Sequence, residues 1–104
     1  MEKFYTHAMW KVRPGDEALF VEAWRGLADA FLSLPVPATR GTLIQSLDDP
    51  SLFYSFGPWE SIEDIQAMRS NSEAQAAIRR VVELCEQAAL ASYRVVAEIG
   101  PGMR

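Results

Sequence analysis

The chain has 104 residues, of which 49% are apolar and 23% are charged, with a formal net charge of −4 at pH 7 and a pI of about 4.9. This length predicts a single domain over residues 1–104, and the apolar content excludes a disordered chain, because enough surface can be buried to offset the ordering entropy. The Lys and Arg residues are scattered and the balance is acidic, which argues against a nucleic-acid partner.

Neither targeting nor membrane insertion is indicated by the sequence. Residues 1–10 contain no uninterrupted apolar stretch, and no run of about 18 apolar residues occurs. Cys85 is the single cysteine, so no intramolecular disulfide can form, which fits a reducing compartment. We therefore expect a cytoplasmic protein that does not bind membranes.

The first elements predicted are a strand and a helix. Residues 4–12 alternate with a period of two, which is typical of a strand, and Arg13-Pro14-Gly15 ends it. Asp16 is a candidate N-cap for a helix of about five turns. Apolar residues recur there at three- and four-residue spacing, which predicts one buried stripe. The stripe comprises Leu19, Phe20, Ala23, Trp24, Leu27, Ala28, Phe31 and Leu34. Pro35 and Pro37 stop the helix.

A hairpin is predicted next. Residues 40–47 form one strand and residues 52–57 the other, because Asp48-Asp49-Pro50-Ser51 between them is a turn signal. We interpret Asp48 and Asp49 as turn residues and not as an acid–base pair.

The second half predicts two helices and a last strand. Ser61, followed by Asp64 three positions later, is a variant of the capping box and starts a helix. Ser70-Asn71-Ser72 interrupts it, and Asn71 or Ser72 can cap the next helix. The stripe that runs from Ile78 through Cys85 extends that helix to about Ala89, and residues 93–99 alternate as the final strand.

This order of elements predicts an α+β fold, the ferredoxin-like βαββαβ arrangement with a four-stranded antiparallel sheet and the helices on one face. The helices should cover the side of the first strand that carries Ala8, Trp10 and Val12. The other side keeps a group of apolar residues, namely Tyr5, Met9, Leu52, Tyr54 and Phe56. An apolar sheet face of this size is typical of an interface, so we expect a homodimer that buries sheet against sheet.

Several segments carry a likeness to a known family. They are Val12-Arg13-Pro14-Gly15, Phe20 in the first helix, Asp48-Asp49-Pro50 in the hairpin and, above all, Trp59-Glu60-Ser61 before the second helix. With these the chain resembles the antibiotic biosynthesis monooxygenase family over about residues 4–99. The resemblance implies a dimeric α+β barrel in which each subunit holds a pocket between its own sheet and helices.

The best-known branch of that family oxidises polycyclic phenols, anthrones or quinols with dioxygen and without metal or flavin. The resemblance implies that Trp59 packs the substrate and donates its indole N–H to a substrate oxygen, and that Arg79 stabilises the substrate anion. Each residue also has a structural interpretation. Trp59 can pack the junction between strand and helix, and Arg79 can be a solvated partner of Glu83.

Some positions depart from the family pattern. Ser55 stands where these oxygenases carry an asparagine, and it can still donate and accept a hydrogen bond. Ile65 stands where they carry a tyrosine and has no hydroxyl. Ala8, Met68 and Ile78 stand at or near the asparagine, tryptophan and heme-ligating histidine of a heme-degrading branch, which argues against heme.

The remaining chemical groups are His7 and Cys85. His7 ordinarily titrates near neutrality and is a candidate base, but strand alternation points it away from Ala8 toward the dimer interior, where a structural role is the alternative. Cys85 lies in the helix stripe and is interpreted as core. The lone His and Cys have no metal-ligand spacing and the isolated glycines form no phosphate cradle, so we expect neither metal nor cofactor.

The function expected is a cofactor-independent monooxygenase that oxidises a small hydrophobic aromatic substrate with dioxygen. Trp59, Arg79 and Ser55 are the expected catalytic residues. The residues expected to contact the substrate are Thr6, Tyr54, Ile65, Met68 and His7. One alternative is a ligand-binding or structural barrel that oxidises nothing, and another is an isomerase with His7 or a carboxylate as base.

Overall fold

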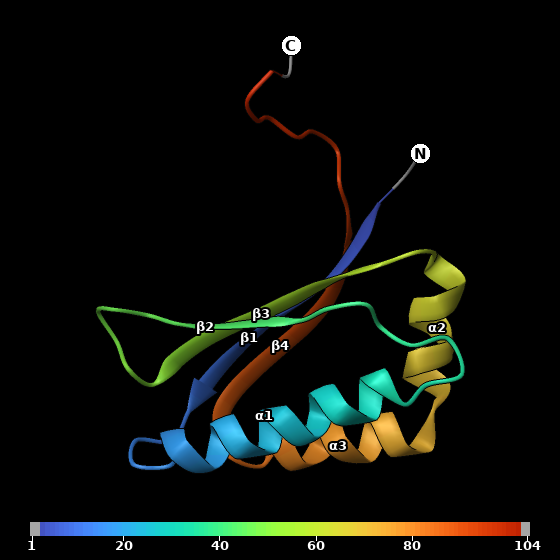
Figure 1. Ribbon diagram of the computed structural model, residues 1–104. Helices are drawn as coiled ribbons and strands as arrows, with labels where there is room; N and C mark the ends of the chain where they lie inside the picture. The colour runs from blue at the N-terminus through green and yellow to red at the C-terminus, as the bar shows by residue number, and fades with distance from the viewer. Residues whose placement is uncertain (1–2, 103–104) are drawn as a thin grey trace.

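The computed structural model describes residues 3–102 (Figure 1). The elements within this range are β1 (Phe4–Val12), α1 (Glu17–Leu32), β2 (Thr42–Gln45), β3 (Leu52–Trp59), α2 (Ile62–Ser70), α3 (Ser72–Val82) and β4 (Cys85–Arg94). The predicted α+β class and βαββαβ order are confirmed, with the second helical region divided into α2 and α3 at the predicted interruption. None of the helices in the described range is long and apolar enough to cross a bilayer.

The strands form an antiparallel sheet in the order β2-β3-β1-β4. Ala8 in the central strand β1 lies opposite Ser55 of β3 on one side and Leu90 of β4 on the other. Helices α1 and α3 lie side by side against one face of the sheet, and α2 sits at one end (Figure 1). The other sheet face has no helix over it among the residues drawn in colour.

The core lies between the sheet and helices α1 and α3. Trp10, Val12, Phe20 and Val81 are fully buried. The ring of Phe20 lies 4.6 Å from that of Phe53 and 5.9 Å from that of Trp10, measured between centroids. Strand alternation therefore assigned the helix-covered face correctly.

Local sequence signals explain where two of the helices begin. The Ser61 hydroxyl accepts the backbone N–H of Asp64 at 3.1 Å, and the Asn71 side chain accepts that of Ala74 at 2.9 Å. Both predicted caps are confirmed. Asp16 precedes α1 as predicted, but its side chain makes no capping bond, and its backbone carbonyl instead accepts the N–H of Phe20 at 2.9 Å.

The predicted bounds of the last helix and the last strand are wrong. The helix ends at Val82 and not near Ala89, and β4 pairs with β1 from Cys85 opposite Val12 to Arg94 opposite Phe4. After Val95, whose N–H is donated to the Lys3 carbonyl, the chain leaves the sheet. The helix-forming residues of this segment take the strand conformation because nine-residue β1 requires a partner along its open edge, and such tertiary pairing overrides local propensity.

Smaller differences concern element ends. Strand β2 covers only residues 42–45 of the expected 40–47, and β3 continues to Trp59. Helix α1 ends at Leu32, but Leu34 is still buried because the chain turns back against the end of the sheet.

Asp49 fixes the turn between β2 and β3. Its carboxylate accepts the backbone N–H of Ser51 at 3.0 Å and the Ser51 hydroxyl at 2.7 Å, and it pairs with the ammonium group of Lys11. The predicted turn role of Asp49 is thereby explained: its side chain accepts both donors of Ser51 and ties the turn to β1.

These contacts predict a specific acid response. The hydrogen bonds from Lys11 and then Ser51 lower the pKa of Asp49 from 3.8 to about 2. Because the folded-state pKa lies below the unfolded value, this carboxylate stabilises the fold fully above about pH 4, and its contribution is lost as the pH falls toward 2. In Lys11→Met we expect the Asp49 pKa to move back toward its ordinary value, measured by NMR titration of the carboxyl carbon. Lys3→Met, which removes the pair with Glu98, is the control, and an unchanged Asp49 pKa in Lys11→Met would contradict the assignment.

Candidate functional site

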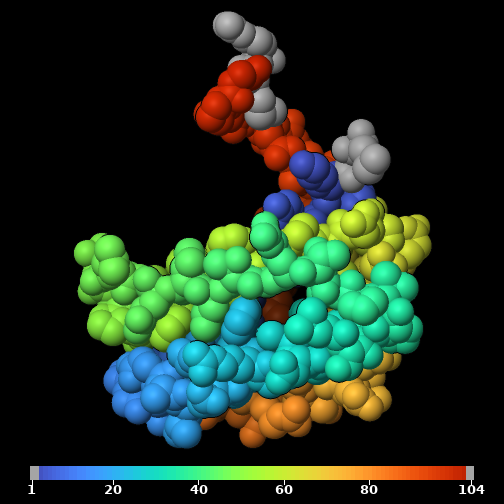
Figure 2. Space-filling view, viewed as in Figure 1, coloured from blue at the N-terminus to red at the C-terminus, as the bar shows by residue number. Residues whose placement is uncertain are grey.

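A cavity of about 410 Å³ lies between the sheet, the helices and the segment of residues 33–41. Ligand sites of this size accept small organic molecules. Figure 2 shows an opening between α1 and the chain that leads to β2, with β4 visible in its depth. The apolar wall is formed by Ala8, Trp10, Trp24, Leu27, Phe31, Ala38, Trp59, Met68, Ile78 and Leu90. The polar side chains of the lining are those of Thr6, Arg40, Ser55, Arg69 and Gln75.

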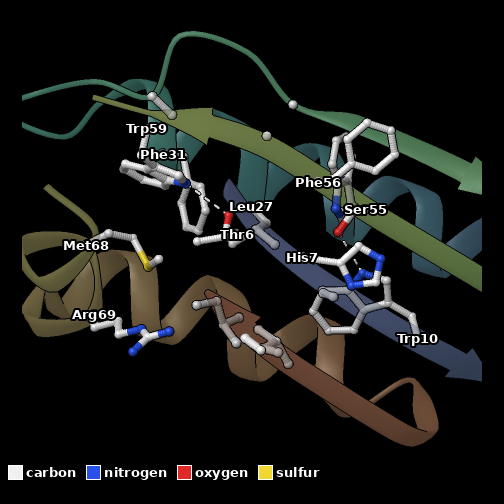
Figure 3. A pocket seen from close by; sticks show the side chains of 18 of the residues that line it. Thr6, His7, Trp10, Leu27, Phe31, Ser55, Phe56, Trp59, Met68 and Arg69 are labelled. Carbon is white, nitrogen blue, oxygen red and sulfur yellow. Dashed lines mark hydrogen bonds between the residues drawn. The ribbon is translucent and has the colours of Figure 1, made fainter. Parts of the chain in front are cut away.

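Two hydrogen bonds between indoles and hydroxyls cross the central strands at the cavity wall. The Trp59 indole N–H is donated from β3 to the Thr6 hydroxyl at 2.9 Å, and the Trp10 indole N–H is donated from β1 to the Ser55 hydroxyl at 2.9 Å (Figure 3). Each indole occupies an acceptor position on its hydroxyl oxygen. The hydroxyl protons of Thr6 and Ser55 are therefore available to a ligand in the cavity.

Trp59 serves both the wall and the packing of the junction after β3. Its side chain is buried, lies against Phe31 with ring centroids 5.7 Å apart, and belongs to the cluster that contains Leu34, Ile65 and Met68. The two interpretations of Trp59 from the sequence thus coexist. Its N–H, however, is bonded to Thr6, so its polar effect on a ligand passes through the Thr6 hydroxyl.

The charged groups of the cavity are arginines. Arg69 donates from Nη2 to the Ser92 hydroxyl across the gap between α2 and β4, and Arg40 lines the cavity from the segment before β2. A Cβ placed on Gly57 would overlap the carbonyl oxygen of Arg40. Glycine at this position of β3 therefore lets residues 33–41 close over the cavity.

The structure brings together only part of the predicted site. Thr6, Ser55, Trp59 and Met68 line the cavity as expected. Arg79 does not line it: this residue is exposed on α3, and no ion pair with Glu83 occurs within residues 3–102.

Two other predicted substrate contacts lie elsewhere, and the ring of a third, His7, points away from the cavity. Ile65 is buried in the cluster behind α2 and is not part of the cavity lining. Tyr54 and His7 project from the opposite sheet face, where their ring centroids are 5.4 Å apart and the His7 ring also meets that of Tyr93 at 5.8 Å. His7 belongs to the cavity lining. Its ring, however, lies on the opposite face of the sheet with Tyr54 and Tyr93.

Sequence reasoning missed Trp24 as a wall residue and Arg40 and Arg69 as its cations. Trp24 was placed in a helix stripe, which fitted ordinary core packing equally well. No local sequence pattern indicates that the two arginines line the cavity, because their positions depend on how residues 33–41 and α2 pack against the sheet. An isolated glycine within a strand, Gly57, is a sequence signal for close backbone approach and points to this closure.

Cys85 is a packing residue, as expected, although on a strand and not a helix. It is buried and its thiol donates to the Val81 carbonyl at 3.4 Å. Burial raises the pKa of the Cys85 thiol, which keeps it protonated. In the described part of the chain no three His, Cys, Asp or Glu side chains gather as metal ligands.

Comparison with known families and structures identifies the family and the fold. The family model described as antibiotic biosynthesis monooxygenase matches residues 3–80. No curated protein matches the sequence.

Solved structures share the fold at low sequence identity. A mutant of SnoaB, a cofactor-independent oxygenase from Streptomyces nogalater, has a TM-score of 0.80 and 14% identity over 94% of this chain and 96% of its own. A protein from Bordetella bronchiseptica, described only by likeness to the same family, has a TM-score of 0.79 and 18% identity over 93% of this chain and 100% of its own. One from Nitrosomonas europaea, described in the same way, has a TM-score of 0.74 and 19% identity over 90% and 99%. At these identities the likeness shows a common ferredoxin-like fold.

Proposed function

The chain belongs to the antibiotic biosynthesis monooxygenase family, and from this premise we propose that it is a cofactor-independent monooxygenase for a hydrophobic phenolic, quinol or polycyclic substrate. The observation that carries the proposal is the cavity itself. It has an aromatic wall with two hydroxyl donors held in place by indoles, and its lining contains arginines but no carboxylate from residues 3–102. The likeness to SnoaB, a cofactor-independent oxygenase with the same fold, also supports the proposal.

The reaction requires an electron-rich substrate anion, which passes an electron to dioxygen before the two radicals combine. For an anthrone, one oxygen atom becomes the new carbonyl, while the other leaves as water with the two hydrogens of the oxidised carbon. All electrons come from the substrate. The protein must bind a flat apolar ring, favour its anion and keep water from the intermediate.

The lining residues fit these tasks. Trp59 and Phe31, whose rings meet edge to face, provide an apolar aromatic wall. The hydroxyls of Thr6 and Ser55 donate to a substrate oxygen on which negative charge develops. The positive field of Arg40, which also lines the cavity, lowers the pKa of a bound phenol. Arg79, the expected cation, lies outside the lining, so we assign this role to Arg40.

The route by which the substrate loses its proton is inferred from the residues that line the cavity. Among residues 3–102, no Asp or Glu lines the cavity, and the His7 ring lies on the other sheet face. We therefore propose that the substrate ionises to solvent under the influence of the donors and cations, with no side-chain base.

This mechanism predicts a distinctive pH profile. Metal-stripped protein should consume dioxygen with an anthrone, naphthol or quinol, yield a product with one added oxygen atom by mass analysis, and turn over faster as pH rises through the substrate's own pKa. Across a substrate series, the midpoint should move with the phenol and not stay near a histidine or carboxyl value. A midpoint that is the same for all substrates would contradict the absence of a base.

A second candidate is a ligand-binding protein without oxygenase activity. It is favoured by the Trp59 indole N–H, which is already bonded to Thr6 and is not free for a substrate oxygen. Binding of these compounds without oxygen uptake would establish this second function. An isomerase finds less support, since its base would have to reach the cavity from the opposite side of the sheet.

We propose further that two chains pair through the sheet face that no helix covers. This open face carries Tyr5, Met9, Tyr54 and Tyr93, and the edge residue Ile44 on it is 47% exposed. An uncovered apolar surface of this kind is typical of an interface between subunits. The expected homodimer is therefore a barrel of two facing sheets, with each cavity inside its own subunit.

A further inference from the structure

We propose that the molecule bound in this cavity carries a permanent acidic group, such as a carboxylate, in addition to its aromatic body, and that Arg69 binds this group. The inference rests on the proposed function in that it takes the cavity as the substrate site. It goes further by naming a charged substrate class and the residue that selects it.

The first argument is the sign of charge inside the cavity. The chain has a net charge of −4, but the Asp, Glu, Lys and Arg residues that line the cavity within residues 3–102 are two arginines, Arg40 and Arg69. Asp and Glu are the majority of the charged residues in the sequence, but none of those in the described range lines the cavity. Two exposed arginines beside an apolar cavity attract organic anions and disfavour organic cations.

The second argument is the state of Arg69. The ion pairs within residues 3–102 join Lys3 to Glu98, Lys11 to Asp49 and Arg25 to Glu22, so no carboxylate of this part of the chain neutralises Arg69. Its bond to the Ser92 hydroxyl uses only one of the five N–H donors of the guanidinium. The remaining donors can hold a carboxylate in a bidentate manner.

The third argument is position. Arg69 lies in the last turn of α2 and is tethered to β4 by Ser92, so its charged group is held at the rim. Figure 3 shows it beside Met68 at the end of the cavity away from Ser55, with Thr6 between the two ends. An acid bound by Arg69 would therefore direct the ring of the same molecule along Trp59 and Thr6 toward Ser55.

The test compares two probes of the same shape, 2-naphthoate and the neutral 2-naphthamide, by isothermal titration calorimetry. We expect the acid to bind at least about tenfold more tightly than the amide, with a preference that shrinks as salt is added. Arg69→Gln should abolish this preference by weakening the binding of the acid much more than that of the amide. Arg80→Gln is the matched control, because Arg80 is an exposed arginine of α3 that does not line the cavity.

The outcomes separate this inference from the oxygenase proposal. Equal affinity for the two probes, a preference that survives in Arg69→Gln, or its loss in Arg40→Gln alone would overturn the role given to Arg69, and so would failure of both probes to bind. Oxygen uptake is not a readout of this experiment. Acid preference through Arg69 in a protein that consumes no oxygen would retain the inference and reject the oxygenase.

Discussion

Thr6→Val is expected to lower kcat for substrate oxidation by about a hundredfold, because in the proposed mechanism the Thr6 hydroxyl donates to the oxygen on which charge develops. Valine preserves the shape of threonine, so the cavity keeps its size. The change also leaves the Trp59 indole N–H without the partner that it has at 2.9 Å. A loss of about 1–3 kcal/mol in the free energy of unfolding should accompany the loss of activity.

Thr6→Ser is the matched control for this prediction. Serine keeps the hydroxyl and loses only a methyl group, so kcat and stability should remain close to those of the parent. Oxygen-electrode kinetics and urea unfolding measure the two effects separately. If Thr6→Val and Thr6→Ser had the same kcat, the hydroxyl would have no part in the reaction.

Met9→Arg is expected to convert the proposed dimer into a monomer. Met9 lies on the central strand β1, between Tyr54 and Ala89 in the register, and belongs to the open face. A central apolar contact is typically worth about 2–4 kcal/mol in an interface, and an unpaired buried charge costs more, so the dissociation constant should rise at least about a hundredfold. Sedimentation or light scattering measures the change in mass.

The monomeric variant should still fold, since an arginine on an uncovered sheet face reaches water. Leu19→Arg is the control because Leu19 is 61% exposed on α1, on the helical side of the molecule. It should change neither the mass nor the circular dichroism spectrum. A Met9→Arg protein that keeps the mass of the parent would place the interface elsewhere or show that the chain is monomeric.

The parts of the fold that followed from sequence are those fixed by local chemistry. The alternation of residues 4–12 predicted β1 with its observed ends and its buried face. Ser61 and Asn71 predicted where two helices begin. Each side-chain oxygen accepts the backbone N–H three residues later, and this local bond does not depend on where the helix packs. These signals need no knowledge of the tertiary structure.

Strand β4 could not be predicted in this way. Its Glu, Gln, Ala and Leu residues favour a helix, whereas residues 93–99 have the alternation of a strand and mostly lie beyond the sheet. What decides the outcome is the open edge of β1, whose backbone groups are satisfied only by a neighbouring strand. The pairing partner β1 lies about 80 residues earlier in the chain, so the sequence near residue 85 contains no signal of this pairing.

The candidate site was predictable only where it lies on the central strands. Thr6, Ser55 and Trp59 share a sheet face, and strand alternation groups them. Arg69 and Arg40 approach from α2 and from the segment before β2, and their placement depends on how those pieces close against the sheet. Arg79 resembled the family's arginine by its spacing, but it occupies an exposed position of α3.

The tryptophans of the aromatic wall also provide an intrinsic fluorescence signal for binding in the cavity. The sequence contains three tryptophans, and Trp10, Trp24 and Trp59 all line the same cavity. The indole emission of the whole molecule therefore originates at the cavity, and a bound aromatic compound should quench or shift it without any label. Collections of compounds can be screened by intrinsic fluorescence alone, before the reaction or its product is known.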